Sequence, residues 1–286
     1  MAFVKKHPFL CVWAAGLCAC AIGGVSLWKT ALGSLLYGLA AALTRPYRSI
    51  FWIGYILQSI FHRPKAAWEL YEIAYRRGGR AGVPMMAYAM LLLENFQYEE
   101  GLNVLQEAKD RKDLTPALEK IRRQNLAIAY EKTGDLTKAI GILEQMGQDY
   151  QYHRSDYYTL LAYYYIEAGE LEKAERVNAL AQEEGTADGG MYDNLGLIAY
   201  KRGKREEAED MFRKALEAEE TMVSPRYYLA QIAEDRGDRE TAAQYLRDLS
   251  GRTITGLNIL SPRMVEEKCR LYCGLGPDEK GDTHEV

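Results

Sequence analysis

Residues 192–217 read YDNLGLIAYKRGKREEAEDMFRKALE, and their apolar positions have the spacing of two helices joined by a tight turn. Tyr192, Leu195 and Ala199 fall on one face of a first helix, because they are three and four residues apart. Gly203 interrupts that helix, since a left-handed turn between antiparallel helices is least costly at glycine. The second helix is lined by Ala208, Met211, Phe212, Ala215 and Leu216. The stretch therefore predicts a helical hairpin.

A small residue recurs along the chain at the position that Ala208 has in this hairpin. The series is Ala67, Gly101, Ala139, Ala174, Ala208 and Ala242, at intervals of 34, 38, 35, 34 and 34 residues. Twelve positions before the last five members stand Ala89, Ala127, Ala162, Gly196 and Ala230. A period in this range predicts stacked helical hairpins, in which small residues let two helices cross closely. The expected fold class is all-α.

The hairpin pattern resembles the tetratricopeptide repeat, which has an aromatic residue, Leu-Gly, a second aromatic residue, a turn glycine, alanine, a large apolar residue and alanine in that order. Partial matches occur in four further units, at residues 82–109, 120–147, 155–188 and 223–250. Residues 64–75 match the second helix alone. The resemblance implies a right-handed α-solenoid of about five hairpins plus a half repeat, over residues 63–250.

Two units depart from the pattern, and one interval is longer than the others. Phe96 stands in place of the turn glycine, and Asn178 stands at a site that is usually large and apolar. In the 38-residue interval, Thr115-Pro116 is typical of a helix cap followed by proline at the first helical position. We expect the following helix to be longer by one turn, which absorbs the four additional residues.

The chain beyond the repeats is predicted to cap the solenoid. Within residues 251–276, Ser261-Pro262 starts a helix with an apolar stripe that covers the last repeat, formed by Met264, Val265, Cys269 and Tyr272. Residues 277–286 are polar and are expected to be a disordered tail.

Residues 1–62 are predicted to be a membrane anchor of one or two transmembrane helices plus an interfacial helix. Residues 8–28 are 21 consecutive positions without a formal charge, and as a helix they span roughly 30 Å, the thickness of a bilayer core. Residues 31–43 reach only about 20 Å as a helix. Residues 50–61 are short and aromatic and lie between basic residues, a composition typical of a helix at the membrane surface. A two-helix hairpin and a single span both fit this sequence.

The charge distribution orients the anchor. Residues 1–68 contain seven Lys or Arg and no Asp or Glu. The positive-inside rule therefore places the repeats in the cytoplasm in both topologies. The alternative is an exported or lipid-anchored protein of cell-envelope assembly, because Leu17-Cys18-Ala19-Cys20 resembles a bacterial lipid-attachment box. The apolar run continues well past Cys20, which favours the anchor.

The remaining residues favour neither nucleic-acid binding nor catalysis. Subtracting the seven N-terminal basic residues from 36 leaves 29 basic against 40 acidic residues, a net charge of -11 that disfavours phosphate binding. No phosphate-binding glycine signature is present, and Cys269 and Cys273 would need two further ligands to hold a metal. None of the four histidines lies near a plausible nucleophile: His7, His62, His153 and His284. We expect no enzyme activity, no cofactor, no metal and no small-molecule substrate.

Tetratricopeptide folds bind partners on the concave wall that the first helices line. The resemblance implies a partner-binding face at Met86, Met90, Leu93, Ile128, Tyr163, Leu197, Tyr200, Tyr227 and Gln231. The family's clamp for a peptide carboxylate is not expected, because its positions carry Asp156, Thr159, Gly190 and Asp193. The predicted function is a membrane-anchored adaptor that binds a protein or peptide.

Overall fold

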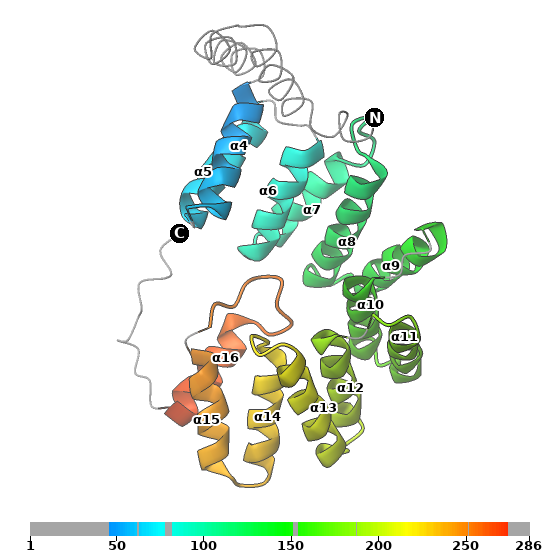
Figure 1. Ribbon diagram of the computed structural model, residues 1–286, viewed down its shortest axis with the longest axis vertical. Helices are drawn as coiled ribbons and strands as arrows, with labels where there is room; N and C mark the ends of the chain where they lie inside the picture. Colours follow the sequence, from blue (N-terminus) through cyan, green and yellow to red (C-terminus); the bar gives the residue numbers. More distant parts are fainter. Residues whose placement is uncertain are drawn as a thin grey trace, which may run out of the picture. The chain divides into compact units, whose positions relative to one another are not determined.

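The structure is a computed structural model that describes residues 46–61, 63–77, 82–150, 154–186, 188–250 and 252–273. Within these ranges it contains thirteen α-helices, α4 to α16, and no strand (Figure 1). The chain forms two compact units, one ending at Tyr88 and the other beginning at Ala89. The all-helical prediction is confirmed. The predicted spans at residues 8–28 and 31–43, all four histidines and residues 277–286 lie outside the described residues.

The first unit contains a hairpin of α4 (Pro46–Ser59) and α5 (Pro64–Arg76). The Phe51 ring lies 5.2 Å from that of Tyr71, whose hydroxyl donates to Gln58 Oε1 at 2.9 Å. A Cβ on Gly54 would lie 3.2 Å from Tyr71, so the two helices approach closely at this glycine. The pattern at residues 64–75 predicts a second helix without a partner, and the structure supplies α4 as that partner.

The second unit consists of consecutive hairpins. Helix α6 (Gly82–Glu94) contains the boundary between the units. The helices that follow are α7 (Tyr98–Glu107), α8 (Pro116–Lys132), α9 (Leu136–Tyr150), α10 (Ser155–Glu167), α11 (Leu171–Glu183), α12 (Gly189–Lys201), α13 (Arg205–Ala218), α14 (Ser224–Asp235), α15 (Arg239–Ser250) and α16 (Pro262–Cys273). Each hairpin packs on the next, for example through α10 with α12 and α13 with α14 (Figure 1).

The recurring small residues lie where the helices cross. All eleven members of the two series are buried. A Cβ on Gly196 would lie 2.5 Å from the Phe212 ring, and one on Gly101 would lie 2.9 Å from Leu93 Cδ2. Both distances are too short for a real contact. The predicted phase of the repeat is therefore confirmed.

The predicted turns also form. Gly134, Gly169, Gly203 and Gly237 have positive φ angles of 90°, 77°, 76° and 77°. Phe96 takes the same left-handed conformation with a φ of 64°, although it has a side chain. That conformation costs an L-residue roughly 1–2 kcal/mol. The turn is thus imposed on Phe96 by the packing of α6 against α7.

Helix α8 explains the 38-residue interval. Thr115 Oγ1 accepts a hydrogen bond from the Leu118 amide at 3.3 Å, and Pro116 is the first helical residue, as predicted. The helix has 17 residues, whereas α10 and α12 have 13 each, which confirms the additional turn.

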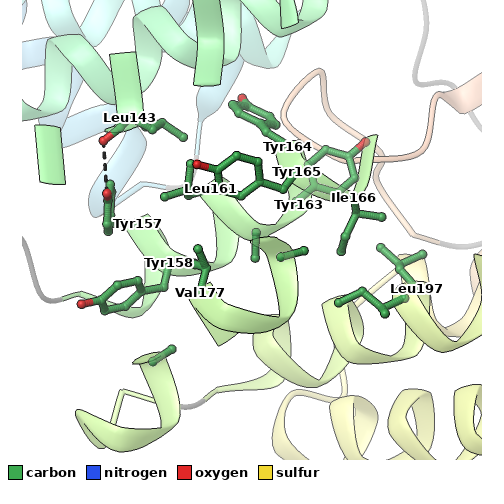
Figure 2. Packing of buried hydrophobic residues seen from close by; sticks show 14 of the residues in the cluster. Leu143, Tyr157, Tyr158, Leu161, Tyr163, Tyr164, Tyr165, Ile166, Val177 and Leu197 are labelled. Atoms are coloured by element: carbon green, nitrogen blue, oxygen red, sulfur yellow. Dashed lines mark hydrogen bonds between the residues drawn. The ribbon is translucent and has the colours of Figure 1, made fainter. Parts of the chain in front are cut away.

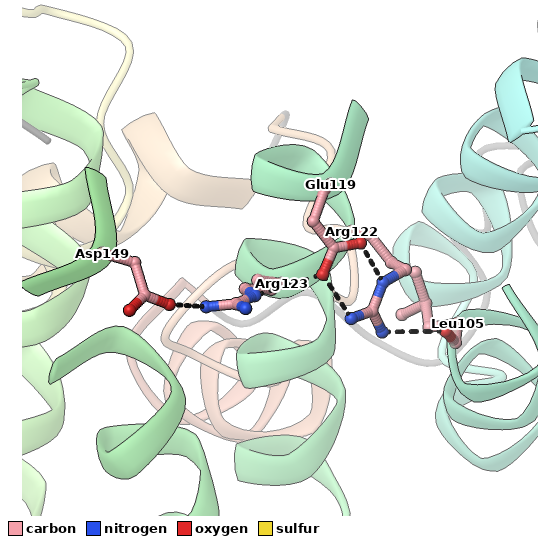
Figure 3. A network of polar contacts seen from close by, with 5 residues as sticks. All are labelled: Leu105, Glu119, Arg122, Arg123 and Asp149. Carbon is pink, nitrogen blue, oxygen red and sulfur yellow. Dashed lines mark hydrogen bonds and ion pairs between the residues drawn. The ribbon is translucent and has the colours of Figure 1, made fainter. Parts of the chain in front are cut away.

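A polar network ties α8 to its neighbours (Figure 3). The buried Arg122 donates to Glu119 at 2.7 Å and to the Leu105 carbonyl at 3.2 Å. Arg123 donates hydrogen bonds to Glu119 at 3.1 Å and to Asp149 of α9 at 2.6 Å. Burial opposes ionisation of Glu119, but hydrogen bonds and charge from the two arginines lower its pKa below the ordinary value. The buried guanidinium is therefore neutralised where α7 ends against α8.

Helix α16 caps the second unit with most of the predicted stripe. Val265 and Cys269 are buried in a cluster with Leu246 and Leu249 of α15. Tyr272 packs on the edge of the same cluster. Met264 is 42% exposed, so the prediction that it belongs to the stripe covering the last repeat is wrong. It precedes Val265 by one residue, which turns its side chain about 100° away from the face that covers the repeat.

Candidate functional site

Eight of the nine predicted partner-binding residues belong to the second unit, and Met86 belongs to the first. Five are buried: Met86, Leu93, Tyr163, Leu197 and Tyr227. Four are half-buried: Met90, Ile128, Tyr200 and Gln231. No observation tests whether any of them binds a partner, so their role stays a prediction. The half-buried residues are the ones that a partner reaches without displacing other side chains.

Tyrosines of α10 fill the core of the second unit (Figure 2). Tyr157 donates its hydroxyl to the Leu143 carbonyl at 3.1 Å, and Tyr165 donates to Glu144 at 2.5 Å. Tyr163 lies beside Tyr164 with 5.8 Å between ring centroids, and burial raises the pKa of both phenols above the ordinary value. Tyr163 therefore stays neutral and supports the fold directly.

Two of the half-buried residues, Tyr200 and Gln231, contact each other where α12 meets α14. The Tyr200 hydroxyl donates to Gln231 Oε1 at 2.9 Å. The Arg205 guanidinium lies 3.9 Å from the centroid of the Tyr200 ring, and Tyr228 contacts that ring edge-on at 5.2 Å. We call Tyr200, Arg205, Tyr228 and Gln231 the aromatic platform. Its rings are held from several sides, so a ligand would order few side chains on binding.

The segment that links α15 to α16 contacts α6, α7 and α8 (Figure 1, orange). We call residues 252–261 the inner segment. The Gly256 amide donates to the Glu94 carbonyl at 2.7 Å, and Tyr98 Oη donates to the Gly256 carbonyl at 3.2 Å. Lys132 Nζ donates to the Asn258 carbonyl at 3.1 Å. The inner segment, although distant in sequence from these helices, therefore occupies part of the predicted binding wall.

A buried carboxyl group lies at one of the positions that the family's peptide clamp uses. Asp193 is buried in α12, where Ser224 Oγ donates to it at 3.1 Å. Burial raises the pKa of Asp193 to about 7, although the Ser224 hydrogen bond acts in the opposite direction. The absence of a carboxylate clamp stays a prediction.

Family models and solved structures agree on the repeat type. Models described as tetratricopeptide repeat match residues 123–150 and 190–222. The structure is similar to the crystal structure of a tetratricopeptide repeat protein from Parabacteroides merdae, with a TM-score of 0.65 at 14% identity over 95% of each chain. The chain has a tetratricopeptide-repeat fold. No curated protein matches the sequence.

Two further solved structures have the same architecture. A thermophilic tetratricopeptide-repeat protein from Thermus thermophilus aligns with a TM-score of 0.55 at 17% identity, over 68% of this chain and all of that one. The Cut9–Hcn1 hetero-tetramer of the APC/C aligns with a TM-score of 0.58 at 13% identity, over 92% of this chain and 52% of that one. At these identities the likeness shows the fold alone, which is a scaffold suited to protein–protein interaction.

The tetratricopeptide pattern could not locate two parts of this site. Tyr228 and Arg205 complete the aromatic platform, yet neither occupies an inward position of the pattern. The inner segment has no helical periodicity. The sequence feature that points to this segment is Thr-Gly at 255–256 between aliphatic residues, and this feature alone does not predict what the segment contacts.

Proposed function

We propose that this chain is a membrane-anchored tetratricopeptide-repeat scaffold whose repeats lie in the cytoplasm and bind a protein or peptide on their inner wall. The aromatic platform is the observation that carries the partner-binding part. Tyr and Arg supply a large share of binding energy at protein interfaces, because they bury a large area and retain polar contacts. On this platform both residue types are half-buried and held in place.

Helix α4 supports the membrane part of the proposal. It buries Phe51 and Gly54 against α5 and exposes a row of large apolar residues, with Trp52 58% and Phe61 at the end of the row 62% exposed. The other members are Ile53, Tyr55, Ile56 and Ile60. Arg48 and Arg63 flank this row. An apolar face with Trp and Tyr between basic residues suits a helix lying in the headgroup region.

The described helices do not by themselves supply a bilayer span, since none combines the length and apolarity that a crossing needs. The proposed anchor therefore rests on the sequence of residues 8–43, together with the exposed face of α4. Its orientation rests on the excess of Lys and Arg before residue 68.

Partner capture tests the binding part. The full chain with Tyr200→Ala and Gln231→Ala should recover at least about tenfold less partner from solubilised membranes, because truncating an aromatic anchor often costs 2 kcal/mol or more. Glu206→Ala with Glu207→Ala is the matched control, since both carboxylates lie exposed on α13. Equal loss in both double variants would place the partner elsewhere. Tyr163 is unsuitable for this test because it belongs to the core.

A C-terminal reporter fusion tests the orientation. A reporter that is active only in the cytoplasm should be active, and one that is active only after export should be silent, with the chain in the membrane fraction. The reverse pattern would favour the exported, lipid-anchored alternative. In that case Cys20→Ser should release the protein from the membrane.

A further inference from the structure

We propose that the inner wall at the α6–α7 turn and at Lys132 is a groove for a peptide that turns at a glycine, that residues 252–261 are its resident occupant, and that a partner segment of the same chemistry displaces them. This inference deepens the proposed function and rests on it. The partner chemistry is a peptide turn with glycine between aliphatic neighbours, as in Ile-Thr-Gly-Leu at 254–257.

The manner of binding indicates a peptide groove. The three hydrogen bonds that hold residues 256–258 of the inner segment against the wall end on main-chain atoms, namely the Gly256 amide, the Gly256 carbonyl and the Asn258 carbonyl. Main-chain recognition is available to any peptide that adopts the same turn, whereas the contacts of flanking side chains give selectivity. A foreign segment can therefore form the same bonds.

The contact at Gly256 sets the size limit of the groove. A Cβ built on Gly256 would lie 1.9 Å from the Leu93 carbonyl oxygen and 3.1 Å from the Phe96 amide nitrogen. Both are main-chain atoms, which cannot move away as a flexible side chain would. The groove thus accepts only glycine at this point, and any residue with a side chain would expel the segment.

The wall of the groove includes the one described residue with a side chain and a positive φ. Phe96 holds a φ of 64° directly beside the Gly256 contact. Residues in sparsely populated conformations gather at ligand-binding positions, where the surrounding structure holds them. The left-handed turn at Phe96 and the small residue at 256 form one binding feature.

The aliphatic residues on either side of Gly256 reach two apolar clusters. Ile259 packs against the core formed around α10, whereas Ile254 and Leu260 join the cluster beneath α16. The segment also shapes itself, because the Thr255 amide donates to Asn258 Oδ1 at 2.7 Å and the Asn258 amide donates to the Thr255 carbonyl at 3.1 Å. These contacts define the peptide chemistry that the groove selects.

Displacement is feasible because only three hydrogen bonds hold residues 256–258 against the wall. A typical hydrogen bond contributes about 1 kcal/mol net, so three contribute far less than the stability of a whole domain. The tether to α15 and α16 nevertheless gives the segment an effective concentration in the millimolar range, as short linkers do. A partner in trans must overcome that concentration.

The test uses the full chain and a fluorescent peptide of residues 252–260, RTITGLNIL. Gly256→Val should expel the inner segment, while Thr253→Val, at an exposed position of the same segment, is the control. We expect the peptide to bind Gly256→Val at least about tenfold more tightly than the parent chain or the control, because competition in cis is removed. Adding Lys132→Ala to Gly256→Val should weaken the peptide about fivefold by removing one hydrogen bond.

Tryptic cleavage after Arg252 reports release of the segment independently. Cleavage should be faster in Gly256→Val. It should also be faster in Lys132→Ala, which adds no larger side chain, and the circular dichroism of both variants should be unchanged. Unchanged cleavage in Lys132→Ala would overturn the proposal, because the segment would not be held at that residue. Faster cleavage without peptide binding to Gly256→Val would also overturn it, since the vacated wall would not bind peptides.

Capture of the membrane partner separates this inference from the proposed function. Stronger capture by Gly256→Val than by the parent chain supports displacement. Equal capture by both chains, with peptide binding intact, overturns displacement while the scaffold function stands. No partner for any variant, with peptide binding intact, overturns the scaffold function and leaves the groove supported.

Discussion

Gly196 and Gly141 are both helical glycines, but their surroundings differ. A Cβ on Gly196 would lie 2.5 Å from the Phe212 ring, whereas one on Gly141 would meet nothing within 4 Å. Gly196→Leu should lower the free energy of unfolding by roughly 1–3 kcal/mol or more, because overpacking forces the helices apart. Gly141→Ala should raise it by up to about 1 kcal/mol through helix propensity. Chemical denaturation measures both, and similar effects at the two positions would contradict the assigned repeat phase.

Asn178 occupies an apolar position without satisfying its amide. It is buried, and neither Nδ2 nor Oδ1 has a hydrogen-bond partner. Leaving a buried polar group unpaired costs about 1–3 kcal/mol, so Asn178→Leu should stabilise the fold by a similar amount. Asn194→Leu is the matched control and should destabilise it, because Asn194 Nδ2 donates to the Thr159 carbonyl at 2.9 Å. Thermal melts of the two variants should shift in opposite directions.

Asp193 should make stability depend on pH. Its folded pKa of about 7 lies above the value of about 3.9 for an unfolded aspartate. Its contribution is therefore fully present below about pH 4 and is lost as pH rises toward 7. Asp193→Asn mimics the protonated form, so its Tm should exceed that of the parent chain by a margin that widens from pH 4 to 7. A margin that is constant with pH would mean that Asp193 does not titrate in this range.

At the scale of elements, α16 covers the last hairpin through one face only. Val265 is buried against Leu246 and Leu249, whereas the neighbouring Met264 is 42% exposed. Val265→Asp should detach α16 and speed amide hydrogen exchange in α15, because a charge would be placed in an apolar cluster. Met264→Asp should leave exchange in α15 unchanged. Equal effects of the two variants would show that α16 does not dock on this face.

The sequence predicts the elements well because their signals are local. The additional turn of α8 follows from Thr115-Pro116 and the long interval, and the turn glycines follow from their spacing. The sequence does not predict the pairing of α4 with α5, because the aromatic composition of residues 50–61 also suits a membrane surface. Phe51 and Gly54 face α5, while Trp52 and Ile53 face away, so one helix both packs against α5 and exposes an apolar face.

The site is less predictable, because burial depends on contacts between distant parts of the chain. Tyr163 and Leu197 occupy inward positions of the pattern, yet neighbouring helices bury them. Tyr200 and Gln231 lie at equivalent positions and remain half-buried. The inner segment meets Glu94 across more than 150 residues of sequence, a contact that no periodicity encodes.

At the scale of the whole molecule, the proposed function gives the apolar face of α4 and the aromatic platform separate tasks. The first suits a lipid surface, and the second suits a protein or peptide. An adaptor needs both, since it brings a partner to the membrane. The inner segment contacts Tyr98 and Lys132, and the proposed displacement adds the condition that a competing peptide must first remove it.

Site-specific photo-crosslinking in intact cells tests the central claim most directly. A photoreactive phenylalanine analogue is placed at Gln231 on the aromatic platform or at Glu207 on the exposed face of α13, each in the full chain. The proposed function predicts one discrete crosslinked partner from position 231, recovered with the membranes, and none from position 207. Crosslinking from position 207 alone, or the same products from both positions, would contradict binding on the inner wall.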